Sequence, residues 1–281
     1  MIFPDRLFKE TGAQSFGVLP FDWLEESMDE GMVKRKERLC PWAKSVVSFT
    51  FPYFCGGAGN LAAFSRGRDY HFEIKERLLP VCAELEEMFP ENRFTAFSDD
   101  APFLEVLAAC FSGAGILGRN GLIACQPFGN YVMLGEIVTD APFDHAETKK
   151  IGSCKSCLKC ESSCPTGAMT IENGRRVLDR SKCIAAITQK KGDLTFEEAD
   201  LLRKSHYIWG CDECLKVCPK SAETHAPRFE RIDSLSLSNL EGLSDDEFKK
   251  KFPERSFTWR GVEPLLRNLR LLLNNIENKQ E

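Results

Sequence analysis

Two short runs of β-branched and aromatic residues stand out in the first half of the chain. Residues 45–51 (SVVSFTF) and 131–138 (YVMLGEIV) have the length of strands and are almost wholly apolar, which predicts two buried strands. From Asp69 to Met88 the apolar residues instead recur at helical spacing, which predicts a helix. Buried strands and a helix together indicate an α/β domain, to which we assign residues 1–148.

Helical patterns return near the end of the printed sequence. Ser244 and Glu247 have the spacing of a capping box, in which two side chains bond the first amides of a helix. From Val262 to Ile276 (VEPLLRNLRLLLNNI) the apolar residues form one stripe, at positions 262, 265, 266, 269, 272, 273 and 276. We therefore expect a short helical segment over residues 229–281. Its stripe should dock on the body of the protein, with a partner interface as the alternative.

Two loops lie between the predicted elements of the first half, and loops on a rigid scaffold are where sites are often built. The first loop, GGAGNLAAFSRGRDYH, is rich in glycine and leads directly into the predicted helix. The second loop, SDDAP, precedes the small-residue stretch FSGAGILGRNG. Both loops are therefore candidates for carrying polar site residues.

Composition and charge narrow the class of protein. With 281 residues, 43% of them hydrophobic, the chain can build a core of ordinary size. The net charge of −5 argues against a nucleic-acid-binding surface over the whole protein. Only residues 149–228 are basic, with 15 Lys and Arg against 10 Asp and Glu. That stretch is either a solvated surface around a metal module or a face that binds a polyanion.

The beginning of the chain does not resemble a secretion signal. Charged residues interrupt every apolar run in residues 1–17, and no later window approaches a membrane span. We therefore expect a cytoplasmic protein with no membrane partner, whose cysteines stay reduced.

Thirteen cysteines in such a chain indicate metal binding rather than disulfide bonds. Five are scattered, whereas eight crowd into 65 residues. Cys154 to Pro165 reads C-x2-C-x2-C-x3-C-P, and Cys211 to Pro219 echoes it as C-x2-C-x3-C-P. This is the bacterial ferredoxin pattern, so we predict two [4Fe–4S] clusters that carry single electrons. A structural zinc site is the alternative, although zinc does not need a third thiolate so close to the first pair.

The motif also predicts which cysteines share a cluster. In two-cluster ferredoxins the cysteine before the proline ligates the other cluster. One cluster is then held by Cys154, Cys157, Cys160 and Cys218. The other is held by Cys211, Cys214 and Cys164, and the candidate for its fourth ligand is Cys183, which lies between the motifs. Such clusters lie close enough for electron transfer, and they need an acceptor elsewhere in the chain or in a partner.

Several further motifs follow one another along the chain. They are SRGRDYH at Ser65, SDDAP at Ser98, GAGILGRN, YVMLGEIVTD, CPTGA at Cys164, LDRSKCI at Leu178, YIWGCDECLKVCP at Tyr207 and WRG at Trp259. In this order they resemble the motifs of the cobalamin-dependent epoxyqueuosine reductases, which are relatives of the reductive dehalogenases. The resemblance extends from about Val33 to Leu273.

This resemblance implies a reaction, a set of cofactors and a fold. Members of the family reduce the epoxide of epoxyqueuosine, in the wobble position of tRNA, to give queuosine, using cobalamin and two [4Fe–4S] clusters. An α+β protein is therefore expected. Residues 1–148 would form a cobalamin-binding α/β domain with a nitroreductase-like sheet, residues 149–228 a ferredoxin-like double-cluster domain, and residues 229–281 the helical segment. Cobalamin would carry out the difficult reduction, with electrons from the clusters.

The resemblance also assigns roles to individual residues. Asp99 matches the proposed proton donor of the family. Asp69, Tyr70 and His71 match polar residues that line the pocket beside the corrin. Cys183 matches the remaining cluster ligand, in agreement with the ligand count above.

The neighbours of Asp99 also suit a proton donor. Loss of an epoxide oxygen needs a general acid, and burial together with the adjacent Asp100 would raise the pKa of one carboxyl toward neutrality. Without the resemblance, Asp99 would be interpreted as a cap of the helix after Pro102. His71 would be interpreted as an ordinary histidine on a helix surface.

Contacts with the corrin are predicted from position along the chain. Arg35, in KRKERLCP, is a candidate for binding the propionamides or the phosphate, with a solvated charge run as the alternative. The other candidates are Ile123, Leu134, Ile137, Asp212 and Glu213. The apolar three are equally explained as core residues.

The sequence departs from the family after WRG, where members continue into helical repeats that help to hold tRNA. The printed chain stops at Glu281, so we expect a short form with only the first such helix. The expected partners are tRNA and an external electron donor such as a flavodoxin or ferredoxin, and the protein is expected to be a monomer. Two alternatives stay open: a ferredoxin-like electron carrier, and a cobalamin-dependent reductase of another small molecule such as an organohalide.

Overall fold

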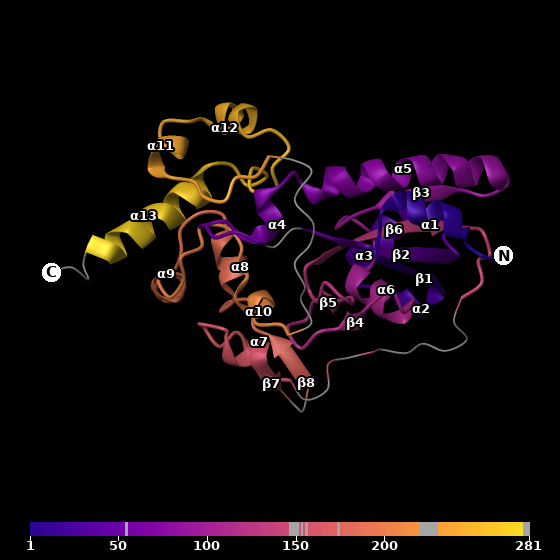
Figure 1. Cartoon of the computed structure of the whole chain (residues 1–281), viewed down its shortest axis with the longest axis horizontal. Helices are drawn as coiled ribbons and strands as arrows, with labels where there is room; N and C mark the ends of the chain where they lie inside the picture. The colour runs from indigo at the N-terminus through magenta and orange to yellow at the C-terminus, as the bar shows by residue number, and fades with distance from the viewer. Residues whose placement is uncertain are drawn as a thin grey trace. The chain divides into compact units, whose positions relative to one another are not determined.

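The chain divides into two compact units, which are described one at a time. The computed structural model describes residues 1–53, 56–145, 152, 154, 157–172, 175–219 and 230–277. The first unit contains the described residues of Met1–Tyr53 and Tyr70–Ser156. The second contains those of Phe54–Asp69, Cys157–Pro219 and Glu223–Glu281 (Figure 1).

A four-stranded antiparallel sheet forms the middle of the first unit. Its strands follow the order β1 (Ser15–Pro20), β2 (Ser45–Pro52), β6 (Val132–Thr139) and β3 (Phe94–Phe97). The two strands predicted from the apolar runs, β2 and β6, are confirmed and lie at the centre of the sheet. Their position there explains why so few of their residues are polar.

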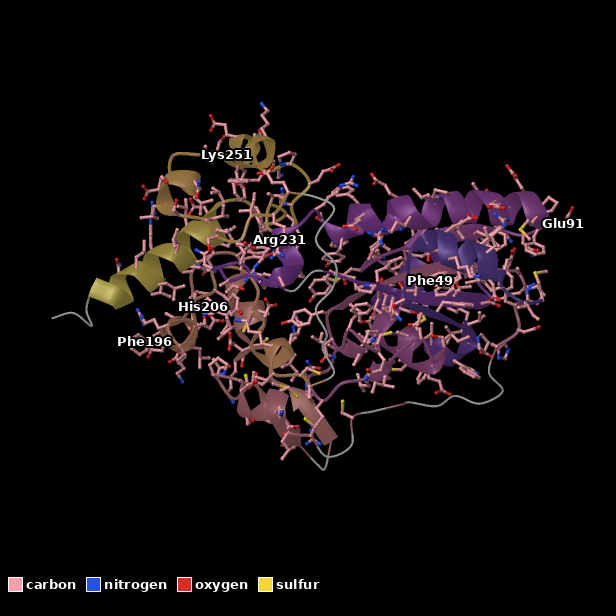
Figure 2. All side chains as sticks on the ribbon, in the orientation of Figure 1. Phe49, Glu91, Phe196, His206, Arg231 and Lys251 are labelled. Atoms are coloured by element: carbon pink, nitrogen blue, oxygen red, sulfur yellow. The ribbon has the colours of Figure 1, made fainter. Side chains whose placement is uncertain are left out.

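One face of this sheet packs against a long helix. The helix α5 (Tyr70–Met88) confirms the helix predicted from Asp69 to Met88, and α1 (Asp5–Thr11) lies beside it. Phe49, labelled in Figure 2, lies in the core beneath these helices. Ile137 belongs to the same core. No helix in the described part of the chain is long and apolar enough to cross a membrane.

The opposite face packs against α6 (Glu105–Phe111) and α2 (Asp22–Glu25), with Val46 and Val138 in the core between them. Because strand residues alternate between faces, Glu136 shares this second face with Val138. The remaining elements of the unit are α3 (Glu30–Leu39) and a small hairpin of β4 (Ile116–Leu117) and β5 (Ile123–Ala124).

Short helices and one hairpin make up the second unit. In chain order they are α4 (Ala63–Arg66), α7 (Lys159–Ser162), β7 (Met169–Glu172), β8 (Arg175–Leu178), α8 (Ile184–Thr188), α9 (Phe196–Leu202), α10 (Glu213–Lys216), α11 (Leu237–Leu240), α12 (Asp245–Lys251) and α13 (Glu263–Glu277). Fully buried Trp209, Phe248 and Phe257 form its core. Ser244 and Glu247 form the predicted capping box ahead of α12.

Residues 56–69 belong to the second unit, although they follow β2 and precede α5 of the first. Leu61 forms a parallel bridge with Trp209, and the Ala62 amide donates to the Trp209 carbonyl at 2.9 Å. The buried Arg66 donates to the carbonyls of Leu61 at 2.7 Å and Gly57 at 3.0 Å. A single domain over residues 1–148 therefore does not describe this segment.

The C-terminal apolar stripe docks on its own unit, as predicted. Leu265, Leu266 and Leu269 of α13 are buried in the core around Trp209. The buried Asn268 donates to the carbonyls of Thr188 at 2.8 Å and Ile208 at 2.9 Å. The described residues after 230 are thus part of the second unit rather than a separate segment, while the side chain of Ile276 lies outside the described residues.

Candidate active site

Asp99 lies in the loop that follows β3, with its carboxylate against the first turn of α5. Tyr70 Oη donates to Asp99 Oδ2 at 2.6 Å, and His71 Nε2 lies 3.6 Å from the same oxygen. The Tyr70 and His71 rings stack, with centroids 4.2 Å apart. Asp99 has a φ of 58°, in the left-handed region that aspartate tolerates better than most residues. The loop thus brings together three of the four predicted catalytic residues.

The pKa of Asp99 is lowered from its ordinary value of 3.8, whereas the sequence predicted that it would be raised. Partial burial does raise it, but the hydrogen bonds from His71 and Tyr70 favour the charged form and outweigh that effect. The predicted pKa increase is therefore wrong, because two donors from α5 stabilise the carboxylate. Asp99 is ionised at neutral pH in this structure.

Asp100 does not share a proton with Asp99, because it has its own partners. Its Oδ2 forms an ion pair with Lys75 of α5, and its Oδ1 accepts from the Ser98 amide at 3.0 Å. Arg35 of α3 donates to the Asp100 carbonyl at 2.5 Å. Arg35 is therefore held against the Asp99 loop rather than in a solvated charge run.

Glu105, the first residue of α6, binds the main chain of this loop. Its Oε2 accepts from the Asp99 amide at 2.9 Å, and its Oε1 accepts from the Ala101 amide at 3.0 Å. Burial raises the pKa of Glu105 to about 7. The N-cap of α6 is Leu104, with no side-chain cap bond, so Asp99 is not the cap of this helix.

Glu136 is a fully buried carboxyl group on the central strand β6. Ser48 Oγ donates to its Oε1 at 3.3 Å, and its Oε2 has no hydrogen-bond partner among the described residues. Burial, reinforced by the charge of Glu105, raises the pKa of Glu136 well above 4.5. Sequence reasoning missed both glutamates. The signal was a single acidic residue inside an otherwise apolar run, YVMLGEIV, because unpaired buried carboxylates are rare.

The apolar corrin candidates do not share one surface. Ile123 is buried in β5, and Ile137 is fully buried in the core beneath α5. Leu134 is partly exposed and packs on the opposite face of the sheet, as expected for residues three apart on a strand. Leu134 and Ile137 therefore cannot line the same pocket. Asp69 belongs to the second unit, where its amide donates to the Glu254 carbonyl at 2.7 Å.

The two cysteine motifs lie side by side in the second unit. The helices α7 and α10, which carry Cys160 and Cys214, pack together, and Ser163 Oγ donates to the Glu213 carbonyl at 3.2 Å. None of the described cysteines forms a disulfide bond, and Cys55 lies outside the described residues. Cys154 is grouped with the first unit, where its amide donates to the Leu117 carbonyl at 3.1 Å.

The surroundings of Cys164 suit a thiolate ligand. Its Sγ accepts from the Ala168 amide at 3.3 Å and lies 3.5 Å from Thr166 Oγ1. Burial raises the pKa of Cys164, but these hydrogen bonds outweigh burial and lower it below 9.0. No three His, Cys, Asp or Glu side chains in the described ranges are gathered closely enough to hold one metal ion. The four thiolates of a [4Fe–4S] cluster lie farther apart than the ligands of a single metal ion, because each of them binds a different iron.

Asp212 and Glu213 have partners inside the second unit. The buried Asp212 accepts from the Ala63 amide, at the start of α4, at 2.7 Å through Oδ2. Glu213 Oε1 accepts from Tyr207 Oη at 3.3 Å and Lys216 Nζ at 3.1 Å. Both carboxylates thus fasten the loop that carries Cys211 and Cys214, and their contact with a corrin stays a prediction.

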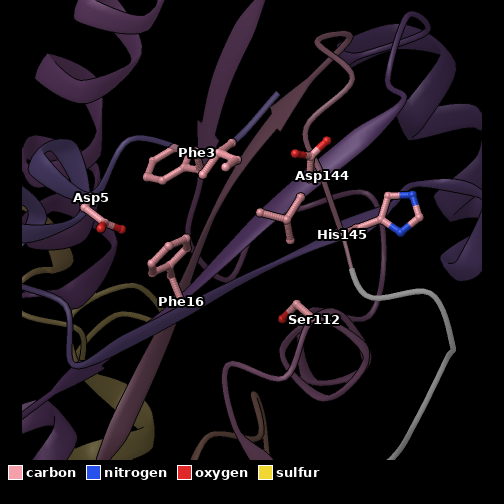
Figure 3. A pocket seen from close by; sticks show the side chains of 8 residues that line it. Phe3, Asp5, Phe16, Ser112, Asp144 and His145 are labelled. Atoms are coloured by element: carbon pink, nitrogen blue, oxygen red, sulfur yellow. The ribbon is translucent and has the colours of Figure 1, made fainter.

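A separate pocket of about 310 Å³ lies in the first unit (Figure 3). Phe3 and Phe16 form part of its wall, with Asp144 and His145 near its rim. The Met1 amino group forms an ion pair with Asp144 at 2.7 Å. None of the predicted site residues lines this pocket, so it is not the candidate active site.

Two family models match the chain in the regions that carry these sites. Residues 153–221 match the 4Fe–4S double cluster binding domain, which includes all eight predicted ligands. Residues 34–100 match the epoxyqueuosine reductase QueG domain, which includes Arg35 and Asp99. The chain is thus an iron–sulfur protein with a double [4Fe–4S] cluster domain joined to an α/β unit. The prediction of two clusters is confirmed at the level of this domain.

Relatives across the whole chain narrow the family further. The epoxyqueuosine reductase of Aliivibrio fischeri is 31% identical over 97% of this chain and 82% of its own length. That of Bacillus anthracis is 37% identical over 74% of this chain and 55% of its own length. The chain belongs to the epoxyqueuosine reductase family. It spans 55% and 65% of the length of the relatives from Bacillus anthracis and Bacillus cereus.

Solved structures of the family have the same fold. An epoxyqueuosine reductase crystallised with an epoxyqueuosine-modified tRNA-Tyr stem loop is 27% identical, with a TM-score of 0.83 over 98% of this chain and 82% of that one. The enzyme from Bacillus subtilis, captured with a catalytic aspartate loop swung out of its active site, is 27% identical. Its TM-score is 0.81 over the same shares of the two chains. The predicted α+β fold is confirmed.

Proposed function

We propose that this protein is an oxidoreductase that reduces epoxyqueuosine in tRNA to queuosine, with cobalamin in its first unit and electrons from two [4Fe–4S] clusters. The observation that carries the proposal is the placement of Tyr70 and His71 against the Asp99 carboxylate, together with the double-cluster domain in the same chain. A relative of the same fold binds an epoxyqueuosine-modified tRNA stem loop, which supports tRNA as the partner here.

The first unit contains groups that fit a corrin beside the Asp99 loop. Arg35 Nε is buried and has no hydrogen-bond partner among the described residues, so it is available to an amide or phosphate oxygen. Leu134 is partly exposed on the sheet face next to this loop, where Ser98 Oγ donates to its carbonyl at 3.1 Å. Arg35 would hold a polar substituent and Leu134 an apolar edge. When bound, cobalamin supplies a strongly reducing cobalt centre for the epoxide.

The polar residues of the loop manage the protons of this reaction. Converting an epoxide to an alkene and water consumes two electrons and two protons. Asp99 is ionised in the resting structure, and Tyr70 and His71, which lie against its Oδ2, are positioned to pass it the proton that it delivers. In the Bacillus subtilis relative a catalytic aspartate loop can leave the active site, which supports Asp99 as the group that carries a proton to the substrate.

The test is turnover by anaerobically reconstituted protein loaded with cobalamin, on an anticodon stem loop that carries epoxyqueuosine. Wild-type protein should form queuosine, detected by mass. Asp99→Asn should lower the rate about 100-fold or more, because it removes the proton-carrying group. The corrin absorption and the iron content should stay unchanged. The exposed Asp22→Asn on α2 serves as the matched control.

Two results would contradict the proposal. Full activity of Asp99→Asn would remove Asp99 from the mechanism. Protein that holds both clusters but retains no cobalamin would instead be an electron carrier. A one-electron donor such as a flavodoxin or ferredoxin should support turnover by the wild type, and the protein should elute as a monomer.

A further inference from the structure

The main chain of the Asp99 loop is bonded by a carboxylate from another element, Glu105 at the start of α6. Both oxygens of Glu105 accept main-chain hydrogen bonds, one from the Asp99 amide at 2.9 Å and one from the Ala101 amide at 3.0 Å. Each of the two amides thus has its own acceptor oxygen on the same carboxylate. Between them the chain turns through the left-handed conformation of Asp99, which is unfavourable for an ordinary residue without support.

We propose that Glu105 is a positioning residue for Asp99. The ionised carboxylate of Glu105 holds the main chain from Asp99 to Ala101, so that the Asp99 carboxylate meets Tyr70 and His71. This inference rests on the proposed function of Asp99 as the proton-carrying group. It goes beyond that function by assigning the conformation of the loop to a partly buried residue on another element. The Asp99 side chain is bonded by Tyr70 of α5, whereas its main-chain amide is bonded by Glu105 of α6.

A second buried carboxyl group makes this arrangement sensitive to pH. Glu136 of β6 lies under the same sheet face, is fully buried, and has an unpartnered Oε2. The charges of Asp99 and Asp100 raise the pKa of both glutamates, and the charge of Glu105 raises that of Glu136 as well. The pair therefore holds a proton on Glu136 before it holds one on Glu105, because only Glu105 accepts bonds from two amides.

The other basic side chains at the Asp99 loop come from neighbouring helices. They are His71 and Lys75 of α5, bonded to Asp99 and Asp100, and Arg35 of α3, bonded to the Asp100 carbonyl. These groups act on the two aspartates rather than on Glu105 directly. Burial raises the pKa of Glu105 to about 7, so the clamp is ionised above that pH and loses its charge below it. Protonation puts a hydroxyl on one oxygen and leaves one of the two amides with a poorer acceptor.

Amide hydrogen exchange of residues 98–101 tests the inference without reference to activity. In wild-type protein, protection of these amides relative to the amides of β3 should fall several-fold as the pH drops from 8 to 6. In Glu105→Gln the protection should be lower by about tenfold at pH 8 and should no longer depend on pH, since the amide side chain has one acceptor only. The exposed Glu87→Gln on α5 should behave as wild type.

The same measurement separates failure of this inference from failure of the proposed function. Asp99→Asn keeps the main-chain amides, so it should retain the protection and its pH dependence even though it loses turnover. The kcat of Glu105→Gln should fall with little change in KM. Its kcat should also no longer change with pH near 7, as the kcat of the wild type does. Wild-type protection that does not change between pH 8 and 6, or that survives in Glu105→Gln, would overturn the inference. The wild-type titration decides the matter if the variant does not fold.

Discussion

At the scale of single residues, two residues with a left-handed backbone conformation are held by hydrogen bonds to neighbouring residues. Among the described residues other than glycine, Asp99 and Glu254 have positive φ, of 58° and 51°. Glu254 accepts the Asp69 amide with its carbonyl and bonds Arg68 through its carboxylate at 2.7 Å. Asp99 is bonded by Glu105 and Tyr70. In both places the hydrogen bonds compensate for a conformation that is unfavourable by about 1–3 kcal/mol.

The buried Glu136 should make folding stability depend on pH. Its pKa is raised in the folded protein and ordinary in the unfolded chain, so the folded state binds the extra proton above pH 4.5. The free energy of unfolding therefore falls as pH rises, by up to about 1.4 kcal/mol per pH unit for one proton. Above pH 7 Glu105 is ionised, so the contribution of Glu136 to this slope can be measured there without that of Glu105.

Glu136→Gln should flatten that slope between pH 7 and 8.5, because an amide does not titrate. Chemical unfolding of wild type, Glu136→Gln and the control Glu87→Gln at several pH values measures it. If the variant loses stability with rising pH as steeply as wild type, Glu136 is not protonated in the folded protein.

At the scale of elements, the contact between α5 and β6 depends on the absence of a side chain at Gly135. A Cβ atom there would lie 2.5 Å from Ile74 Cγ2 and 3.1 Å from Leu78 Cδ1, both on α5. The helix therefore approaches the strand more closely than any other residue would allow. This close approach brings the first turn of α5, with Tyr70 and His71, to the loop after β3.

Gly135→Ala should lower the free energy of unfolding by about 1–3 kcal/mol through overpacking. Thermal unfolding measures the effect. The same substitution at Gly67, where no atom lies within 4 Å of the added carbon, is the control and should change little. Equal effects at both positions would show that the packing of α5 on β6 is not the cause.

Local sequence patterns predicted the helices and strands better than the contacts between residues of different elements. The strands β2 and β6 and the helices α5 and α13 were predicted because apolar periodicity is a property of consecutive residues. The pKa of Asp99 was predicted with the wrong sign because its partners come from α5, and no local pattern records a contact between residues 70 and 99. Glu105 was missed for the same reason.

At the scale of the whole molecule, the predicted ligand set has a direct test. With two [4Fe–4S] clusters the protein should hold about eight irons per chain. Cys183→Ser should reduce this to about four, because one cluster loses its fourth ligand, while the other cluster keeps all of its cysteines. Iron analysis and electron paramagnetic resonance of the reduced protein measure the change.

The buried Cys110→Ala, outside both motifs, is the control for that experiment and should keep the full iron content. Retention of about eight irons by Cys183→Ser would show that another residue completes the second cluster. Zinc in place of iron in the wild type would contradict the cluster domain itself.

The pairing of Leu61 with Trp209 sets an order of events during synthesis. A ribosome synthesises β1 and β2 before the segment around Leu61, then β3 and β6, and only much later Trp209, with which Leu61 pairs. The nascent chain can thus complete its sheet while the residues around Leu61 still expose apolar surface, and the core that closes over them arrives with α13. The core of the second unit is therefore expected to close only after α13 has been synthesised, when all eight predicted cluster cysteines are already part of the nascent chain.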